Sequence, residues 1–295
     1  MKHNLKNSFA PFNSALDAAL ALSVANALTE DVGVCDFTGL LIPANQLVSA
    51  RVVVRETAIL CGAPWFNAVM KSVDDAIEID WHYAEGDSMV PNSVVCEITA
   101  PARSLMTAER SALNFLQMLS AVATKTNDYV KLIEGTAAKI LDTRKTLPGM
   151  RLAQKYAVRV GGGVNQRLAL YDGILIKENH IAAAGGIEPS LKAAFLIQEK
   201  NPEITVQIEV EDLHELEVAL SAGAKSILLD NFNVELMREA VRVNRGRAIL
   251  EASGGVDFTT VRAIAETGVD RISIGALTKD VKAIDFSMRV LDVLN

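Results

Sequence analysis

Between residues 138 and 279, short apolar runs alternate with helical segments, and this alternation constrains the fold more than any other feature. Helical periodicity is clearest in Leu213–Ser221, Glu235–Val243 and Thr259–Glu266. Strands that alternate with helices run parallel and are joined by right-handed crossovers. The pattern therefore predicts a parallel sheet of six strands, formed by Lys139–Leu141, Gly173–Ile176, Thr205–Val210, Ser226–Leu229, Ala248–Glu251 and Arg271–Ile274.

Two architectures fit this pattern, a shortened six-stranded α/β barrel and an open doubly wound sheet. A complete barrel of eight units takes roughly 250 residues, so a barrel here would be incomplete. The barrel is favoured because Ser253-Gly254-Gly255 and Gly275-Ala276 end the last two strands. Barrels often bind phosphate there through backbone amides. The run Gly161–Gly163 lacks the spacing of a dinucleotide-binding or P-loop motif.

The first part of the chain has a different character. A helix near 14–27 precedes runs with strand character that are separated by turns, which predicts a small α+β domain with an antiparallel sheet. A long helix, about Thr107–Ile133, follows. Arg110 lies near the predicted start of this helix, where the helix dipole disfavours a cation. This position indicates a functional role for the Arg110 side chain. The expected strands are Val48–Leu60, Ile77–Tyr83 and Val94–Thr99.

Charge is unevenly distributed along the chain. The net charge of −7 argues against nucleic acid as a partner. From Lys139 to Lys177, however, eight Lys and Arg residues stand against two acids, Asp142 and Asp172. A cationic segment in an otherwise acidic protein suits a small anionic ligand.

Cysteine usage and the absence of an apolar leader indicate a soluble cytoplasmic protein without a membrane partner. The three cysteines, Cys35, Cys61 and Cys96, are widely spaced and odd in number, which fits reduced thiols. The most apolar helix candidate, Ala15–Leu28, is interrupted by Asp17 and is too short to span a bilayer.

Polar or small residues follow every predicted strand, and in α/β barrels the chemistry sits at that edge. Cations there are suited to carboxylates, acids to hydroxyl groups or to Mg²⁺, and small residues to a phosphate. His180 either caps a turn, packs in the core or acts in catalysis, and Glu211 is not assigned to the site. The cations are Arg144, Lys145, Arg167 and Lys177, the acids Glu209 and Asp230, and the small residues Ser253, Gly254, Gly275 and Ala276.

Several segments together resemble the quinolinate phosphoribosyltransferase family over nearly the whole chain. The most specific is Asp142-Thr143-Arg144-Lys145-Thr146-Leu147-Pro148-Gly149. The others are Glu109–Asn114, Lys155–Val158, Gly161–Gly163, Leu175–His180, Leu229–Asn231, Glu251–Gly255 and Ser273–Thr278.

The resemblance implies an N-terminal α/β sandwich domain, 1–126, and an incomplete barrel, 127–279, with 280–295 packing back on the first domain. It implies transfer of a phosphoribosyl group from phosphoribosyl pyrophosphate to quinolinate with decarboxylation, Mg²⁺ as cofactor, and a homodimer with a shared active site. Lys145, Lys177, Glu209 and Asp230 would be catalytic, and the two acids would also serve the metal. The substrate-binding set would be Arg110, Thr143, Arg144, Lys145, Gln166, Arg167, Lys177, Glu209, Asp230, Ser253, Gly254, Gly275 and Ala276.

One position departs from the family pattern. The family usually has Asn-His-Arg after the triple glycine, whereas this chain has Asn165-Gln166-Arg167. Glutamine donates hydrogen bonds but carries no charge, so we expect quinolinate to bind with less electrostatic help. Three other functions remain open: a related phosphoribosyltransferase for another aromatic acid, a Schiff-base aldolase that uses Lys145 or Lys177, and a binding protein without activity.

Overall fold

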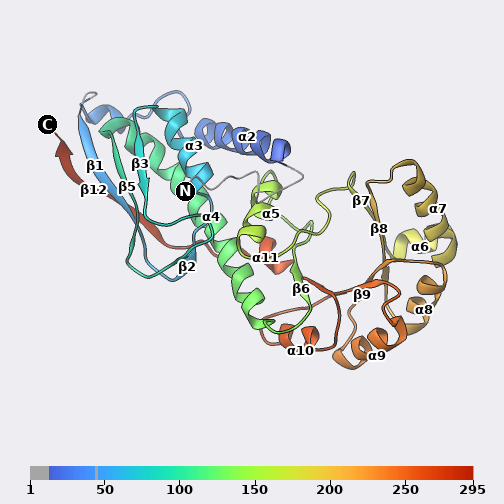
Figure 1. Ribbon diagram of the computed structural model, residues 1–295. Helices are drawn as coiled ribbons and strands as arrows, with labels where there is room; N and C mark the ends of the chain where they lie inside the picture. Colours follow the sequence, from blue (N-terminus) through green and yellow to red (C-terminus); the bar gives the residue numbers. More distant parts are fainter. Residues whose placement is uncertain (1–12, 44–45, 295) are drawn as a thin grey trace. The chain divides into compact units, whose positions relative to one another are not determined.

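The computed structural model describes residues 13–43 and 46–294, and the chain forms two compact units (Figure 1). Unit 1 combines the N-terminal part up to Asn127 with Thr146–Gly162 and the segment from Thr278 onward. Unit 2 comprises Asp128–Lys145 and Gly163–Leu277. Residues 1–12 of the predicted first domain, together with 44–45 and 295, lie outside the described residues.

Unit 1 contains an antiparallel sheet with the strand order β12-β1-β5-β3. Alternate residues of β1, such as Val48, Ala50 and Val52, are buried, whereas Arg51 is exposed, as expected for a sheet with one covered face. The predicted run Val48–Leu60 divides into two strands, because β2 leaves the main sheet to pair with β4. The strands are β1 (Leu47–Val54), β2 (Ala58–Ile59), β3 (Glu78–Trp81), β4 (Ser88–Met89), β5 (Val94–Pro101) and β12 (Phe286–Leu294).

Helices complete the core of unit 1. The expected long helix, α4, buries Leu113, Leu116 and Leu119 along one face. Trp65 of α3 and Tyr156 of α5 are both buried, with ring centroids 5.4 Å apart. The helices are α2 (Asn13–Asp31), the 3₁₀ turn η1 (Gly39–Leu41), α3 (Ala63–Val73), α4 (Ala102–Leu132) and α5 (Arg151–Val160).

Unit 2 contains the predicted six-stranded parallel sheet, with the order β6-β11-β10-β9-β8-β7. The strands follow the chain in sequence except that the first, β6, pairs with the last, β11. This order belongs to a singly wound barrel that is open between β6 and β7, whereas a doubly wound sheet would reverse direction at a switch point. The strands are β6 (Lys139–Leu141), β7 (Gly173–Ile176), β8 (Thr205–Val210), β9 (Ser226–Asp230), β10 (Ile249–Ser253) and β11 (Arg271–Ser273).

Crossover helices connect these strands. Helix α8 has the bounds expected from the sequence, and each of α8 and α9 begins at a capping side chain: Asp212 accepts the Glu215 N–H, and Asn233 accepts the Leu236 N–H, both at 2.8 Å. The helices are α6 (Glu178–Ala184), α7 (Ile187–Lys200), α8 (Leu213–Ser221), α9 (Val234–Asn244), α10 (Val261–Ala265) and, at the end of the unit, α11 (Ala276–Lys279).

One segment groups differently from the expected domain limits. Residues 146–162 were placed with the barrel, but they cluster with unit 1 because α5 packs against α2. Lys155 and Tyr156 of α5 are buried there. Across the described residues, no helix is both long enough and apolar enough to cross a bilayer.

Candidate active site

The carboxyl ends of the six parallel strands bring most of the predicted residues to one edge of the sheet. Register fixes their neighbours: Ser253 of β10 lies beside Asp230 of β9, and Glu209 of β8 lies beside Leu228. Every predicted substrate-binding residue except Arg110 belongs to unit 2. This edge is therefore the candidate active site.

Two guanidinium groups meet at the start of this edge. The Nε atoms of Arg144 and Arg167 are both buried and have no hydrogen-bond partner among the described residues. Arg167 Nη1 donates to the Gly173 carbonyl at 2.8 Å. Burial and the neighbouring charge of Arg144 lower the pKa of Arg167. Two like charges held together with buried donors left over are suited to an anion that accepts from both.

Asp142 organises the loop that carries Gln166 and Arg167. Its carboxylate is fully buried and accepts from Asn165 Nδ2 at 2.6 Å and from the Gln166 backbone N–H at 2.9 Å. The backbone of Val164 also pairs with Leu141 as an isolated parallel bridge. The loop is thereby fixed to the end of β6. Asp142 belongs to the most specific segment of the sequence, but its role in fixing this loop was not predicted.

Lys177 and Glu209 form an ion pair between the ends of β7 and β8. Lys177 Nζ lies 2.7 Å from Glu209 Oε2, and Glu209 is 8 % exposed while the lysine side chain is 44 % exposed. The partly exposed ammonium remains accessible to a ligand. His180 Nδ1 accepts the Lys177 backbone N–H at 3.1 Å, so His180 caps α6, as one of its sequence interpretations proposed.

The ends of β9 and β10 approach each other closely. Asp230 accepts from Asn231 Nδ2 at 2.9 Å, and the Asn231 backbone N–H donates to the Ser253 carbonyl at 3.1 Å. Gly254 has a φ of +99°, and a Cβ there would collide with the Asn231 side chain. Glycine is required at this turn, and it leaves backbone amides near the strand ends.

Lys145 extends beside the end of β11. A Cβ added to Gly275 would lie 3.1 Å from Lys145 Cδ and 3.7 Å from Thr143 Oγ1. The Lys145 backbone N–H donates to Thr143 Oγ1 at 3.1 Å. The loop after β6 and the small-residue loop after β11 therefore lie against each other. A side chain at Gly275 would press on the stem of Lys145.

Carboxylates are the metal-binding side chains that this edge offers. In the parts of the chain that the structure describes, no three His, Cys, Asp or Glu side chains are grouped to hold an ion. A cavity of about 150 Å³ beside Glu209 is lined by three further acids, Glu178, Glu211 and Glu215. Because no metal-binding group of three exists among the described residues, a Mg²⁺ ion at Glu209 and Asp230 would fit only if a substrate and water supplied most of its ligands.

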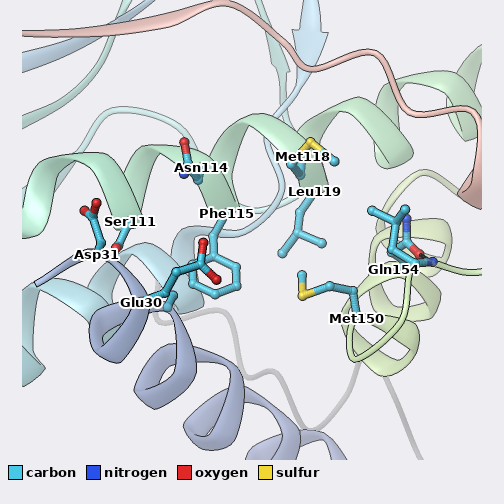
Figure 2. A pocket seen from close by; sticks show the side chains of 11 residues that line it. Glu30, Asp31, Ser111, Asn114, Phe115, Met118, Leu119, Met150 and Gln154 are labelled. Carbon is cyan, nitrogen blue, oxygen red and sulfur yellow. Dashed lines mark hydrogen bonds between the residues drawn. The ribbon is translucent and has the colours of Figure 1, made fainter. Parts of the chain in front are cut away.

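Unit 1 has a cavity of a different kind. It measures about 230 Å³ and lies between α2, α4 and the start of α5 (Figure 2). Figure 2 shows Phe115, Met118 and Met150 around it, with Glu30 and Asp31 at one side. Apolar walls with two acids do not suit an anionic ligand.

Two buried polar residues behind the candidate site, Gln207 and Glu251, were not among the site residues predicted from the sequence. Gln166 Nε2 donates to Gln207 Oε1 at 2.9 Å, and Gln207 Nε2 donates to Glu251 Oε2 at 3.0 Å. The signal was present, because Gln207 stands two residues before Glu209 and shares its face of the strand.

Comparison with known proteins agrees with this geometry. The family profile "Quinolinate phosphoribosyl transferase, N-terminal domain" matches residues 35–120, and the corresponding C-terminal domain profile matches residues 122–289. A probable nicotinate-nucleotide pyrophosphorylase [carboxylating] of Bacillus subtilis is 38 % identical over 88 % of this chain and 90 % of its own length. The Mycobacterium leprae nicotinate-nucleotide pyrophosphorylase is 39 % identical over 90 % of this chain and 95 % of its own.

Solved structures give the same result. The nicotinate-nucleotide pyrophosphorylase of Francisella tularensis has a TM-score of 0.89 at 44 % identity, covering 93 % of this chain and 97 % of the other. A pyrophosphorylase from Pyrococcus furiosus, at 16 % identity and a TM-score of 0.66, shares the fold.

Proposed function

The chain belongs to the quinolinate phosphoribosyltransferase family, and we propose that the strand-end edge of unit 2 performs that family's reaction. The protein is a pentosyltransferase of NAD biosynthesis. It transfers the phosphoribosyl group of phosphoribosyl pyrophosphate to quinolinate, with release of pyrophosphate and CO₂ and formation of nicotinate mononucleotide. Relatives are named for either direction, as carboxylating or decarboxylating.

One observation carries the assignment of this site: the buried, unpaired Nε atoms of Arg144 and Arg167. Quinolinate has two adjacent carboxylates, and a guanidinium binds a carboxylate through parallel N–H donors. A dianion between the two arginines would satisfy both Nε atoms and offset the repulsion between the guanidinium groups. Gln166 and Thr143 would lie at the margin of this subsite.

The remaining residues fit the phosphoribosyl half of the reaction. Lys145 and Lys177 supply positive charge for the pyrophosphate, and Glu209 and Asp230 supply acceptors for the ribose hydroxyl groups. The loops with Ser253, Gly254, Gly275 and Ala276 supply backbone N–H groups for the 5′-phosphate. Glu209 and Asp230 would also hold the Mg²⁺ ion, which, when bound, neutralises charge on the leaving pyrophosphate.

The chemistry needs positioning more than a base. The bond between ribose C1 and pyrophosphate breaks as the pyridine nitrogen, whose lone pair is free, attacks C1. Lys145 and Lys177 stabilise the negative charge of the leaving group. The alkylated ring nitrogen is cationic, so the neighbouring carboxylate leaves as CO₂ and the ring carbon then takes a proton from solvent. Arg144 and Arg167 contribute by holding the two carboxylates in place.

A homodimer is the second part of the proposal. Arg110 lies in unit 1, on an exposed face of α4, whereas the other site residues lie in unit 2. In the proposed assembly, Arg110 of one subunit reaches the quinolinate carboxylates in the site of its partner. The structure begins α4 at Ala102, so Arg110 lies in the third turn, beyond the reach of the helix dipole, and its exposure alone supports this role.

The test is an assay with quinolinate and phosphoribosyl pyrophosphate, with and without Mg²⁺. We expect equal amounts of CO₂, pyrophosphate and nicotinate mononucleotide, loss of activity on chelation, and no turnover of nicotinate. Turnover of another aromatic acid without CO₂ would assign the chain to a related phosphoribosyltransferase. Quinolinate binding without product would indicate a binding protein. An aldolase is disfavoured because Lys177 is ion-paired with Glu209, whereas a Schiff-base lysine reacts as a neutral amine.

A further inference from the structure

A buried chain of polar groups leads from the candidate quinolinate subsite into the barrel. Gln166 Nε2 donates to Gln207 Oε1 at 2.9 Å, and Gln207 Nε2 donates to Glu251 Oε2 at 3.0 Å. Gln207 is on β8 and Glu251 on β10, so this second hydrogen bond passes over the intervening strand β9. The three side chains therefore lie inside the curved sheet. The chain of hydrogen bonds ends at a carboxyl group that is 1 % exposed.

The surroundings of Glu251 make its ionised form costly. Its Oε1 atom is buried without a hydrogen-bond partner among the described residues. Its register neighbours are the apolar Leu228 on β9 and the cation Arg271 on β11. Burial raises the pKa of Glu251, and the negative charge of Asp142 adds to this, whereas hydrogen bonds from Gln207 and Ser273 and the charge of Arg271 act in the opposite direction. Glu251 therefore takes up a proton more readily than an exposed glutamate does.

Hydrogen-bond polarity couples Glu251 to Gln166. An ionised carboxylate only accepts, so Gln207 must turn its NH₂ group toward Glu251 and its oxygen toward Gln166. Gln166 then donates from its own NH₂ group to Gln207, so the amide oxygen of Gln166 points away from Gln207. A proton on Oε2, the oxygen that contacts Gln207, turns Glu251 into a donor toward Gln207. Both amides then rotate by half a turn, and the Gln166 N–H groups face away from Gln207.

We propose that Gln207 and Glu251 are positioning residues that set which end of the Gln166 carboxamide faces a quinolinate carboxylate, and that substrate binding draws a proton onto Glu251. The proposal rests on the proposed function, because it needs a carboxylate beside Gln166. An amide oxygen repels that carboxylate and an N–H group binds it, so the ligand selects the protonated state. By this route a neutral side chain at position 166 serves an anionic substrate.

The wild-type protein gives the first test. Calorimetric titration with quinolinate in two buffers of different ionisation enthalpy measures proton uptake on binding. We expect uptake of at most about one proton per chain at every pH at which Glu251 is ionised in the free protein, and a KM for quinolinate that rises as Glu251 ionises. Benzene-1,2-dicarboxylate, which has no ring nitrogen, should give the same uptake. Binding of both ligands without proton uptake at any pH would overturn the proposal.

Two variants separate positioning from simple structural support. Glu251→Gln supplies a permanent amide donor, so it should bind quinolinate without proton uptake and with a KM that no longer depends on pH. Gln207→Leu interrupts the chain, so it should raise KM about tenfold at every pH, change kcat much less, and also abolish proton uptake. Glu235→Gln, at an exposed position of α9, is the matched control and should behave as wild type.

The outcomes distinguish the two proposals. Turnover of quinolinate together with unchanged proton uptake in Glu251→Gln would refute the role of Glu251 and leave the proposed function intact. Absence of quinolinate turnover in the wild-type protein would instead refute the proposed function. If Gln207→Leu does not fold, the wild-type uptake and the Glu251→Gln pH profile still decide.

Discussion

Among single residues, Arg144 provides the sharpest test of the site. Its buried Nε atom has no hydrogen-bond partner among the described residues, as the proposed contact with a quinolinate carboxylate requires. We expect Arg144→Ala to lower kcat/KM for quinolinate by several kcal/mol of transition-state binding, on the order of a hundredfold or more. Steady-state kinetics measure this, with Arg238→Ala on the exposed side of α9 as control. A loss smaller than about threefold would contradict the assigned role.

Gln166 stands where the family resemblance led us to expect a histidine. A histidine there would bring a group that can carry charge near neutral pH beside the carboxylates. We expect Gln166→His to lower the KM for quinolinate severalfold below about pH 7 and to have less effect at higher pH, as the imidazole loses its proton. KM measured from pH 6 to pH 9 is the readout. Unaltered KM and kcat would mean that charge at this position is unimportant.

At the scale of elements, α5 holds together two loops that continue into the site. Gln154 of α5 is 2 % exposed, accepts the Leu147 N–H and donates to the Thr278 carbonyl, each at 2.8 Å. Leu147 follows the loop with Arg144 and Lys145, and Thr278 follows the small-residue loop.

Gln154→Leu would remove the hydrogen bonds that Gln154 makes with both of these backbone groups. We expect it to lower the free energy of unfolding by about 1–3 kcal/mol and to reduce kcat more than KM, because the loops lose their spacing. Denaturant unfolding and kinetics measure both effects. Gln198→Leu, which removes one hydrogen bond to Ile204 on the outer helix α7, is the control. Equal losses of activity in the two variants would count against a special role for Gln154.

The turn before the first strand is held by a carboxylate with a depressed pKa. Asp36 accepts the Gly39 N–H and the Thr107 hydroxyl, both at 2.8 Å, and these bonds lower its pKa, the Gly39 N–H contributing most. The folded state therefore releases this proton more readily than the unfolded chain. The stabilisation is fully present above the usual value of 3.8 and is lost as pH falls through the lowered pKa.

Asp36→Asn should therefore cost about 1 kcal/mol of unfolding free energy at pH 7, and the difference from wild type should shrink as pH falls below about 4. Denaturation curves of both proteins at a series of pH values measure this difference. A gap that stays constant down to about pH 3 would show that the charge of Asp36 contributes nothing.

The positions of helices and strands could be predicted from the sequence more accurately than the contacts between them. Periodicity located all six parallel strands and α8, because apolar spacing is a local signal. It also placed Lys177 and Glu209 at one edge, since the ends of parallel strands must meet. It did not predict the grouping of α5 with unit 1, because Lys155 and Tyr156 bury there through contacts that are distant in sequence. The polarity of the Gln207–Glu251 chain likewise depends on a hydrogen bond between non-adjacent strands.

At the scale of the whole molecule, the proposed dimer makes each site depend on two chains, and mixed dimers test this directly. Arg110→Ala and Lys177→Ala should each be nearly inactive alone, since each removes one cation from every site. In a mixed dimer, however, unit 2 of the Arg110→Ala chain keeps its own Lys177 and would receive an intact Arg110 from the Lys177→Ala chain. One of the two sites of the mixed dimer would therefore be complete. Random pairing of equal amounts should therefore restore about a quarter of wild-type activity.

Activity measured after subunit exchange tests this prediction. A mixture of Lys177→Ala with Lys145→Ala is the control, because both changes lie in unit 2 and leave no complete site. If the first mixture recovers no activity although mixed dimers are detected, Arg110 serves its own chain or no site at all.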